Sequence, residues 1–106
     1  MPKYTIENHI NFVTLLSSIE LDSFYTRPTD VCIDTSIFIL KKLNELNLNS
    51  NSIKVSPSPD GEIVIEFFKD LKYYSFDVFD DEIYFCGFDD VKEVGIDEIT
   101  NLLKKI

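Results

Sequence analysis

The chain has 106 residues, a net charge of −9 and 44% hydrophobic residues, with nine Phe and five Tyr. This length suits one domain with its own core, and the aromatic content excludes a disordered chain. No apolar run approaches the roughly 20 residues that span a bilayer, and the first residues lack the features of a signal peptide. We therefore expect a single cytoplasmic domain over residues 1–106.

The negative charge is concentrated in the second half of the chain. Residues 60–98 hold thirteen acids and three bases, whereas the remaining residues hold six acids and seven bases. Such a field repels nucleic-acid phosphates and anionic membranes, so we expect neither as a direct partner. If the field serves recognition, the partner is basic; the alternative is that the charge only keeps the domain soluble.

The first part of the chain predicts two helices. Apolar residues recur at helical spacing after Thr5, a suitable N-cap, so we expect a first helix over about residues 5–20. A loop follows. The second helix has Thr29 or Asp30 as its cap and ends near Leu46, before a linker rich in Asn and Ser.

Alternating apolar and polar residues then predict an antiparallel β-meander. Pro59, Asp60 and Gly61 are typical of a tight turn, because Pro fixes φ and Gly accepts a positive φ. Three or four strands joined by short loops are expected, beginning near Ile53 and continuing at 62–68, 73–79 and 82–86, with 87–90 closing the last one. Asp97 is expected to cap a C-terminal helix.

This order of elements predicts the fold class. It is an α+β domain with two N-terminal helices, an antiparallel meander of three to four strands and a C-terminal helix, with the helices packed on one face of the sheet.

The alternation assigns the strand side chains to two faces of the sheet. The face toward the helices receives Ile63, Ile65, Phe67, Tyr74, Phe76, Val78, Ile83 and Phe85. The opposite face receives Glu62, Val64, Glu66, Phe68, Tyr73, Asp77, Phe79 and Tyr84. Its mixture of rings and carboxylates is typical of a wet recognition surface. A helix covering part of this face is the alternative, and a bulge would exchange the two faces.

We predict a partner-binding site on this second face and its turns. Aromatic rings supply buried area, and flanking carboxylates attract Lys or Arg. The predicted residues are Glu62, Glu66, Phe68, Tyr73, Asp77, Phe79, Asp80, Asp81, Tyr84, Asp89 and Asp90. The same open face is the surface through which a homodimer would form.

Patterns typical of catalysis or metal binding are not found in the sequence. His9 is the only histidine and lies on a polar stretch, so we expect a surface residue and no catalytic triad. The acidic turns lack the spacing of an EF-hand, and three glycines are too few for a phosphate-binding loop. No metal or cofactor is expected. Cys32 and Cys86 are expected to pack in the core as reduced thiols.

One segment resembles a known group of sequences. The run from Ser56 to Phe67, SPSPDGEIVIEF, resembles the hairpin P-[ST]-P-D-G-G-[IV]-x-[LF]-E-W of a group of small uncharacterised bacterial proteins. The order of elements from Pro28 to Ile106 is also similar, whereas Glu62 and Phe67 stand where that motif has Gly and Trp. The resemblance implies a fold and an accessory role in bacterial or phage gene pairs, without a catalytic activity.

Three functions remain open. The first is an antitoxin, immunity or anti-defence protein, which is no enzyme and inhibits a basic protein partner through the aromatic and acidic face. The second is a DNA mimic, whose carboxylates imitate phosphates and occupy a nucleic-acid channel. The third is an enzyme that uses a carboxylate pair such as Glu66 and Asp77. We favour the first.

Overall fold

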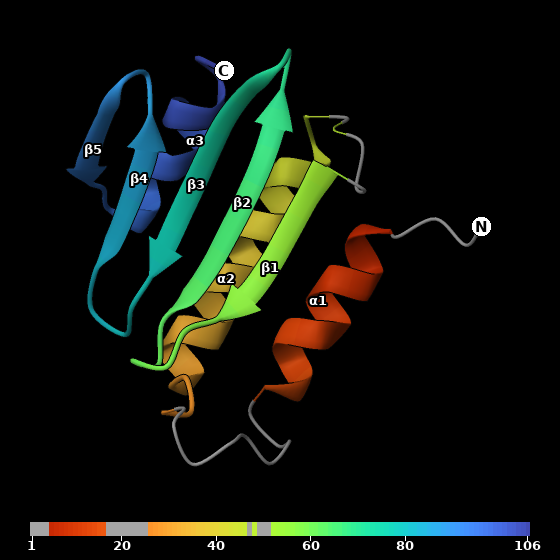
Figure 1. Ribbon diagram of the computed structural model, residues 1–106, viewed down its shortest axis with the longest axis vertical. Helices are drawn as coiled ribbons and strands as arrows, with labels where there is room; N and C mark the ends of the chain where they lie inside the picture. Colours follow the sequence, from red (N-terminus) through yellow and green to blue (C-terminus); the bar gives the residue numbers. More distant parts are fainter. Residues whose placement is uncertain (1–4, 17–25, 47, 49–51) are drawn as a thin grey trace.

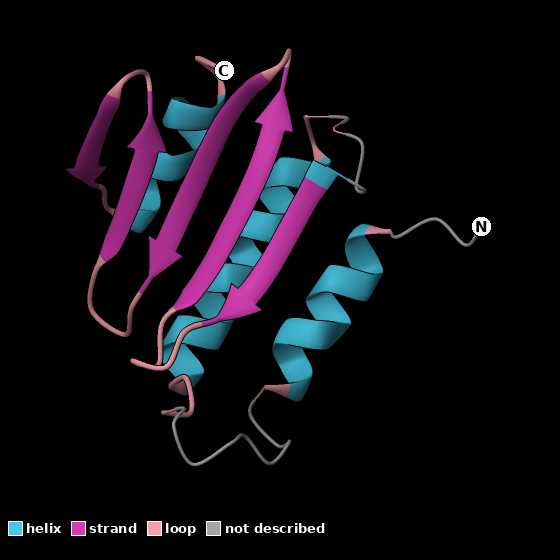
Figure 2. Cartoon of the chain, in the orientation of Figure 1, coloured by secondary structure: helices cyan, strands magenta, loops and turns pink. Residues whose placement is uncertain are grey.

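The structure is a computed structural model and describes residues 5–16, 26–46, 48 and 52–106 (Figure 1). The fold is α+β, with one antiparallel sheet and three α-helices in the described residues (Figure 2). The elements are α1 (Ile6–Leu15), α2 (Asp30–Asn44), β1 (Ile53–Pro57), β2 (Ile63–Lys69), β3 (Lys72–Val78), β4 (Ile83–Gly87), β5 (Asp90–Glu93), a 3₁₀ turn (Ile96–Glu98) and α3 (Ile99–Leu103). The predicted α+β class is confirmed.

The first two helices begin where their threonine caps predict. The backbone N–H of Asn8 donates to Thr5 Oγ1 at 3.3 Å, and Asn8 Oδ1 accepts from the Thr5 N–H at 2.8 Å. In α2, the Cys32 N–H donates to Thr29 Oγ1 at 3.2 Å. Each such cap stabilises a helix by about 1 kcal/mol. The end of the first predicted helix, most of the loop after it and most of the linker lie outside the described residues.

Helix α1 buries a histidine, so the expectation of a surface residue was wrong. His9 is 8% exposed and lies one helical turn before the fully buried Val13. The helix contacts α2 and β1, and its buried residues are His9 and Val13. Helical periodicity therefore decided the burial of His9 more strongly than its polar neighbours in the sequence did.

The sheet is a meander of five strands in the order β1-β2-β3-β4-β5, each antiparallel to the next. The prediction of three to four strands was wrong, because it did not include β5. Residues 87–90 do not close the sheet, because Phe88 and Asp89 form a turn and Asp90 begins β5. All four residues of β5 are exposed. A strand with no buried residue lacks the apolar alternation by which strands are recognised.

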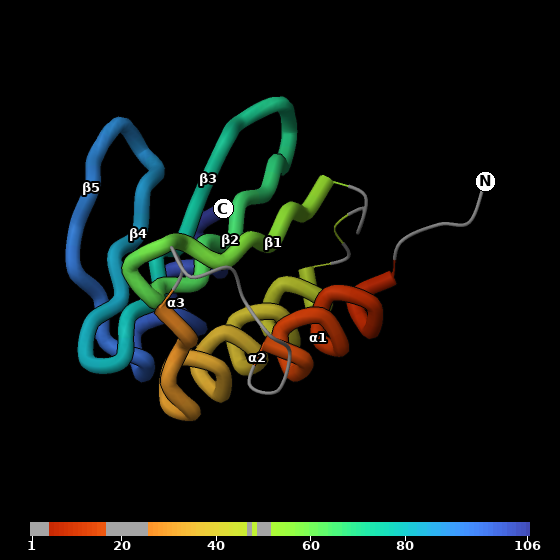
Figure 3. The backbone as a smooth tube through the Cα atoms, turned by 60° about the horizontal axis from the view of Figure 1, so that its bottom comes forward, coloured from red at the N-terminus to blue at the C-terminus, as the bar shows by residue number. Residues whose placement is uncertain are grey.

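The helices lie together on one side of the sheet (Figures 1 and 3). Helix α2 contacts β2 and β3, and α3 contacts α2. The core between the layers contains every residue predicted for it: Ile63, Ile65, Phe67, Tyr74, Phe76, Val78, Ile83 and Phe85 are all buried.

The Pro-Asp-Gly turn joins β1 to β2 as predicted. The Gly61 N–H donates to Ser58 O at 3.1 Å, and Gly61 has a φ of 88°. The turn also holds the chain before α2, since the Thr26 N–H donates to Pro59 O at 2.8 Å. A Cβ on Gly61 would lie 3.2 Å from the Thr26 methyl group. Glycine is therefore required here both by backbone conformation and by close packing.

The C-terminal helix begins later than predicted. Gly95 precedes a 3₁₀ turn, Ile96–Glu98, and α3 follows at Ile99. Asp97 lies inside this turn and makes no side-chain capping bond, so its assignment as the N-cap was wrong. The Glu98 N–H donates to Gly95 O at 3.0 Å, and this tighter bond replaces the expected first α-helical turn.

We expect Leu71→Gly to stabilise the protein. Asp70 and Leu71 form the two-residue β2–β3 turn with φ values of 53° and 67°, and the Leu71 side chain is 99% exposed. A left-handed conformation costs a non-glycine residue about 1–2 kcal/mol, and glycine's larger loss of chain entropy offsets part of the gain. Thermal unfolding should show a midpoint raised by about 3–5 °C. Leu71→Ala, which shortens the side chain and keeps the strain, should show no gain; an equal gain would contradict this account.

Candidate functional site

The face of the sheet turned away from the helices is open among the described residues (Figure 3). The register aligns its side chains in rows across the strands. One row contains Lys54, Glu66, Ser75, Cys86 and Val91, and the next contains Ser56, Val64, Asp77, Tyr84 and Glu93. Six of the eight residues predicted for this face lie on it as strand residues, and the other two, Glu62 and Phe79, lie in the adjoining turns.

Two carboxylates repel each other in the middle of this face. Glu66 and Asp77 lie in adjacent rows of neighbouring strands, so they are diagonal neighbours roughly 7–8 Å apart at the backbone. Burial, and then the negative charge of Glu66, raise the pKa of the Asp77 carboxyl. Neither forms an ion pair with a described cation, although Lys54 is in register with Glu66. A cation from another molecule would relieve the repulsion.

A second group lies at the β3–β4 turn. The Tyr84 hydroxyl donates a hydrogen bond to the Glu82 carboxylate, and this bond, together with the charge of Glu82, raises the pKa of Tyr84. The Phe79 ring packs edge-on against Tyr84, with centroids 6.0 Å apart. Glu62 Oε2 is buried and has no hydrogen-bond partner in the described structure. A buried polar atom that is left unpaired costs stability.

An aromatic pair lies at the other end of the face. The rings of Phe68 and Tyr73 meet edge-on with centroids 5.4 Å apart, and these side chains are 51% and 45% exposed. Exposed rings on a rigid strand pair provide contact area at little cost in side-chain entropy.

The structure places the predicted site residues in separate groups. It brings Phe68 to Tyr73, Glu66 near Asp77, and Phe79 to Tyr84. The aspartates are divided: Asp80 and Asp81 precede β4, and Asp89 and Asp90 follow it. A five-residue strand separates the two pairs by roughly 17 Å.

Sequence reasoning missed several residues of this face. Val91 and Glu93 were missed because β5 was not expected, and Lys54 was not assigned to a face. Glu82 precedes Tyr84 by two residues, and residues at this spacing lie on the same face of a strand. This spacing could have predicted the contact between the two side chains.

The two cysteines differ in environment. Cys32 is buried as expected, with Sγ 3.0 Å from Val78 O, and burial raises the pKa of its thiol to about 11. Cys86 is half-buried on the open face, in register with Ser75, so the expectation of core packing was wrong for it. Its strand position, and not its apolar character, places it there.

The described residues show neither a metal-binding cluster nor a membrane-spanning helix. They contain no group of three His, Cys, Asp or Glu side chains arranged to hold a metal ion. No helix among them has the length and apolar character needed to cross a membrane.

The fold and the face together define a class: a small α+β domain whose antiparallel sheet presents an open acidic and aromatic surface. Comparison of the chain with protein-family models, curated proteins and solved structures finds no match. The resemblance of residues 56–67 to a bacterial hairpin motif therefore stays a prediction.

We expect Asp77→Asn to stabilise the protein at neutral pH. A carboxyl whose pKa is raised in the folded state binds protons there more readily than in the unfolded chain. Stability therefore falls as pH rises from the ordinary pKa of 3.8 through the raised value, and the full cost is present above it. Urea unfolding should show a higher midpoint for Asp77→Asn at pH 7, and the gain should vanish below the ordinary pKa. The control is Asp81→Asn, which removes a charge from an exposed turn; a lower midpoint for Asp77→Asn at pH 7 would contradict the account.

The thiols should react at different rates. Iodoacetamide at pH 8 is expected to label Cys86 in the folded protein well before Cys32, because Cys32 is buried and its raised pKa keeps it protonated. Mass spectrometry of peptides after timed quenching measures both rates. In urea, where burial is lost, the two rates should converge, and a persistent difference there would assign the effect to local sequence.

Proposed function

We propose that this protein is a small acidic binding module, of the antitoxin, immunity or anti-defence kind, that inhibits a basic protein partner through the open face of its sheet. One observation carries the proposal: exposed rings share this face with carboxylates that form no ion pair with a described cation, while the helices cover the other face.

The rings and the carboxylates have different roles in this proposal. Phe68 and Tyr73 supply the apolar area that contributes affinity, because ring burial dominates interface energetics. Glu66 and Asp77 attract cationic side chains and exclude acidic partners, since steering and specificity are the main effects of charge at an interface. The proposed binding requires no chemical step at the face, so the protein would inhibit its partner by covering part of the partner's surface.

A DNA mimic is the second candidate. The observation in its favour is the position of Asp80–Asp81 and Asp89–Asp90, two exposed acidic pairs held at the two ends of one strand. In this case the partner's nucleic-acid channel would contact the ends of the sheet, and the rings between them would contribute little.

Capture of the partner at two salt concentrations tests the proposal. The tagged protein is used as bait in an extract of its native host, and the captured protein is identified, purified and titrated by calorimetry. We expect binding to persist at 1 M salt, where the Debye length is about 3 Å. Phe68→Ala and Tyr73→Ala should each weaken binding by about tenfold or more, as expected for interface anchors.

A matched control is Val31→Ala, which shortens an exposed side chain on α2 and should leave the affinity unchanged. The DNA mimic would be supported instead if binding is lost in 1 M salt and if neutralising the aspartates at either end of β4 weakens binding equally. If no basic protein is retained at either salt concentration, both candidates fail.

A further inference from the structure

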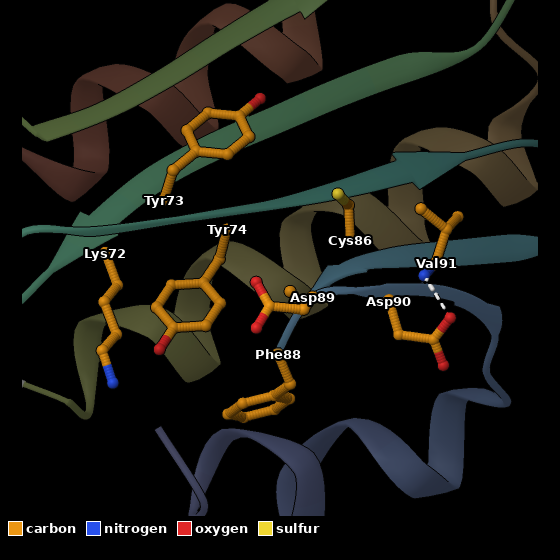
Figure 4. A pocket seen from close by; sticks show the side chains of 9 residues that line it. Lys72, Tyr73, Tyr74, Cys86, Phe88, Asp89, Asp90 and Val91 are labelled. Carbon is orange, nitrogen blue, oxygen red and sulfur yellow. Dashed lines mark hydrogen bonds between the residues drawn. The ribbon is translucent and has the colours of Figure 1, made fainter.

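A notch opens at one end of the sheet, between β3 and the β4–β5 turn. The β3–β4 register ends at Ser75 and Cys86, so the first three residues of β3 have no strand partner on that side. A hollow of about 720 Å³ lies there (Figure 4). Its lining consists of Lys72, Tyr73, Tyr74, Cys86, Gly87, Phe88, Asp89, Asp90 and Val91.

Aromatic rings form the walls of the notch. Tyr74 and Phe88 meet edge-on with centroids 5.7 Å apart, while the Tyr73 side chain extends to the other side of the strand (Figure 4). A Cβ on Gly87 would lie 2.6 Å from the Tyr74 ring and 2.7 Å from that of Phe85. The absence of a side chain at Gly87 thus lets the backbone pass close to these rings.

The turn beside the notch holds a ring and a carboxylate in a costly conformation. Phe88 and Asp89 have φ values of 52° and 61°, where a hairpin of this type favours Asn and Gly. Phe88 is nevertheless 50% exposed, so its ring is not held there by complete burial. Neither Asp89 nor Asp90 forms an ion pair with a described cation.

We infer that this notch binds an arginine side chain of the basic partner, an inference that rests on the proposed function. A guanidinium is planar, stacks on aromatic rings and donates two parallel hydrogen bonds to a carboxylate. Phe88 and Asp89 provide both kinds of contact at one mouth. Lysine fits less well, because its ammonium is a strongly hydrated point charge.

The exposed edge of β3 supports the partner's backbone beside that arginine. Lys69 and Lys72 flank the two-residue β2–β3 turn and form a hydrogen-bonded pair, so the Lys72 N–H and C=O point toward β2. Tyr73, the next residue, therefore directs its N–H and C=O the other way, toward the notch. An extended segment carrying the arginine can pair with these two groups.

Titration with a short peptide tests the notch alone. The probe is acetyl-Gly-Ser-Arg-Ser-Gly-amide, and its controls replace Arg by citrulline, a neutral isostere, or by Lys. In ¹⁵N-labelled protein we expect the Arg peptide to shift the amide signals of residues 72–74 and 86–91, with the two controls binding at least about tenfold more weakly. Equal binding of Arg and citrulline, or shifts confined to Glu66 and Asp77, would overturn the inference.

Variants of the turn provide the second arm. Asp89→Asn keeps the left-handed turn and Phe88→Gly relieves its strain, so both variants should fold normally. Each should weaken binding of the Arg peptide by at least about tenfold. Lys72→Gln should strengthen binding, because it removes a cation from the rim. The matched control is Asp70→Asn in the β2–β3 turn, which should have no effect. Unchanged binding by Asp89→Asn would overturn the inference.

The same variants separate this inference from the proposed function. If a captured basic partner depends on Phe68 and Tyr73 but not on Phe88 or Asp89, the notch is not its arginine site and the open face stands. If the Arg peptide binds the notch while no partner is retained, the proposed function fails and the arginine site stands.

Discussion

Four rings beneath the sheet decide which of its faces meets the helices. Phe67 stacks on Tyr74 at 5.4 Å and lies 6.1 Å from Phe76, and Phe85 lies 5.1 Å from Phe76. Burying such a side chain contributes about 1.5–3 kcal/mol, so together they contribute roughly 6–12 kcal/mol. That is comparable with the entire stability of a small domain, about 5–15 kcal/mol. A slip of one residue in the register of any of these strands would turn the rings of that strand toward water, and the composition of the open face follows from this constraint.

The sequence predicts the parts of the fold that depend on burying apolar side chains between the sheet and the helices. It does not predict the parts that lack such a pattern. The core residues of β2 to β4 follow from strict alternation, and the first hairpin follows from Pro59 and Gly61. Strand β5 could not be found, because a strand exposed along its whole length carries no hydrophobic period. The burial of His9 was missed because its neighbours are polar, although it shares a helical side with Val13. For the candidate site, the alternation of side chains along each strand predicted correctly which strand residues lie on the open face. The notch could not be predicted in this way, because it depends on where the pairing of β3 and β4 ends, which no local sequence pattern encodes.

Features that cost stability are concentrated on the sheet side of the molecule. Asp77 has its pKa raised by burial and by Glu66, Leu71 and Phe88 occupy left-handed turns, and Glu62 Oε2 is buried without a described partner. On the helix side, by contrast, α1 and α2 have threonine caps and a mostly apolar packing surface, in which His9 and Ser36 are the buried polar residues. Natural sequences break local rules mainly where function requires it. The distribution of these costs therefore supports recognition at the open face and its ends independently of net charge.

The same charges oppose self-association through that face. Packed sheets lie about 10 Å apart, so two copies meeting face to face would confront Glu66, Asp77 and Glu93 with the same residues of the second copy. Lys54 is the one cation in these two rows, too few to compensate three carboxylates. A basic partner meets no such repulsion. Because removing paired charges from water consumes much of their attraction, the central acids would mainly select the partner. The rings at the ends of the face would then supply most of the affinity.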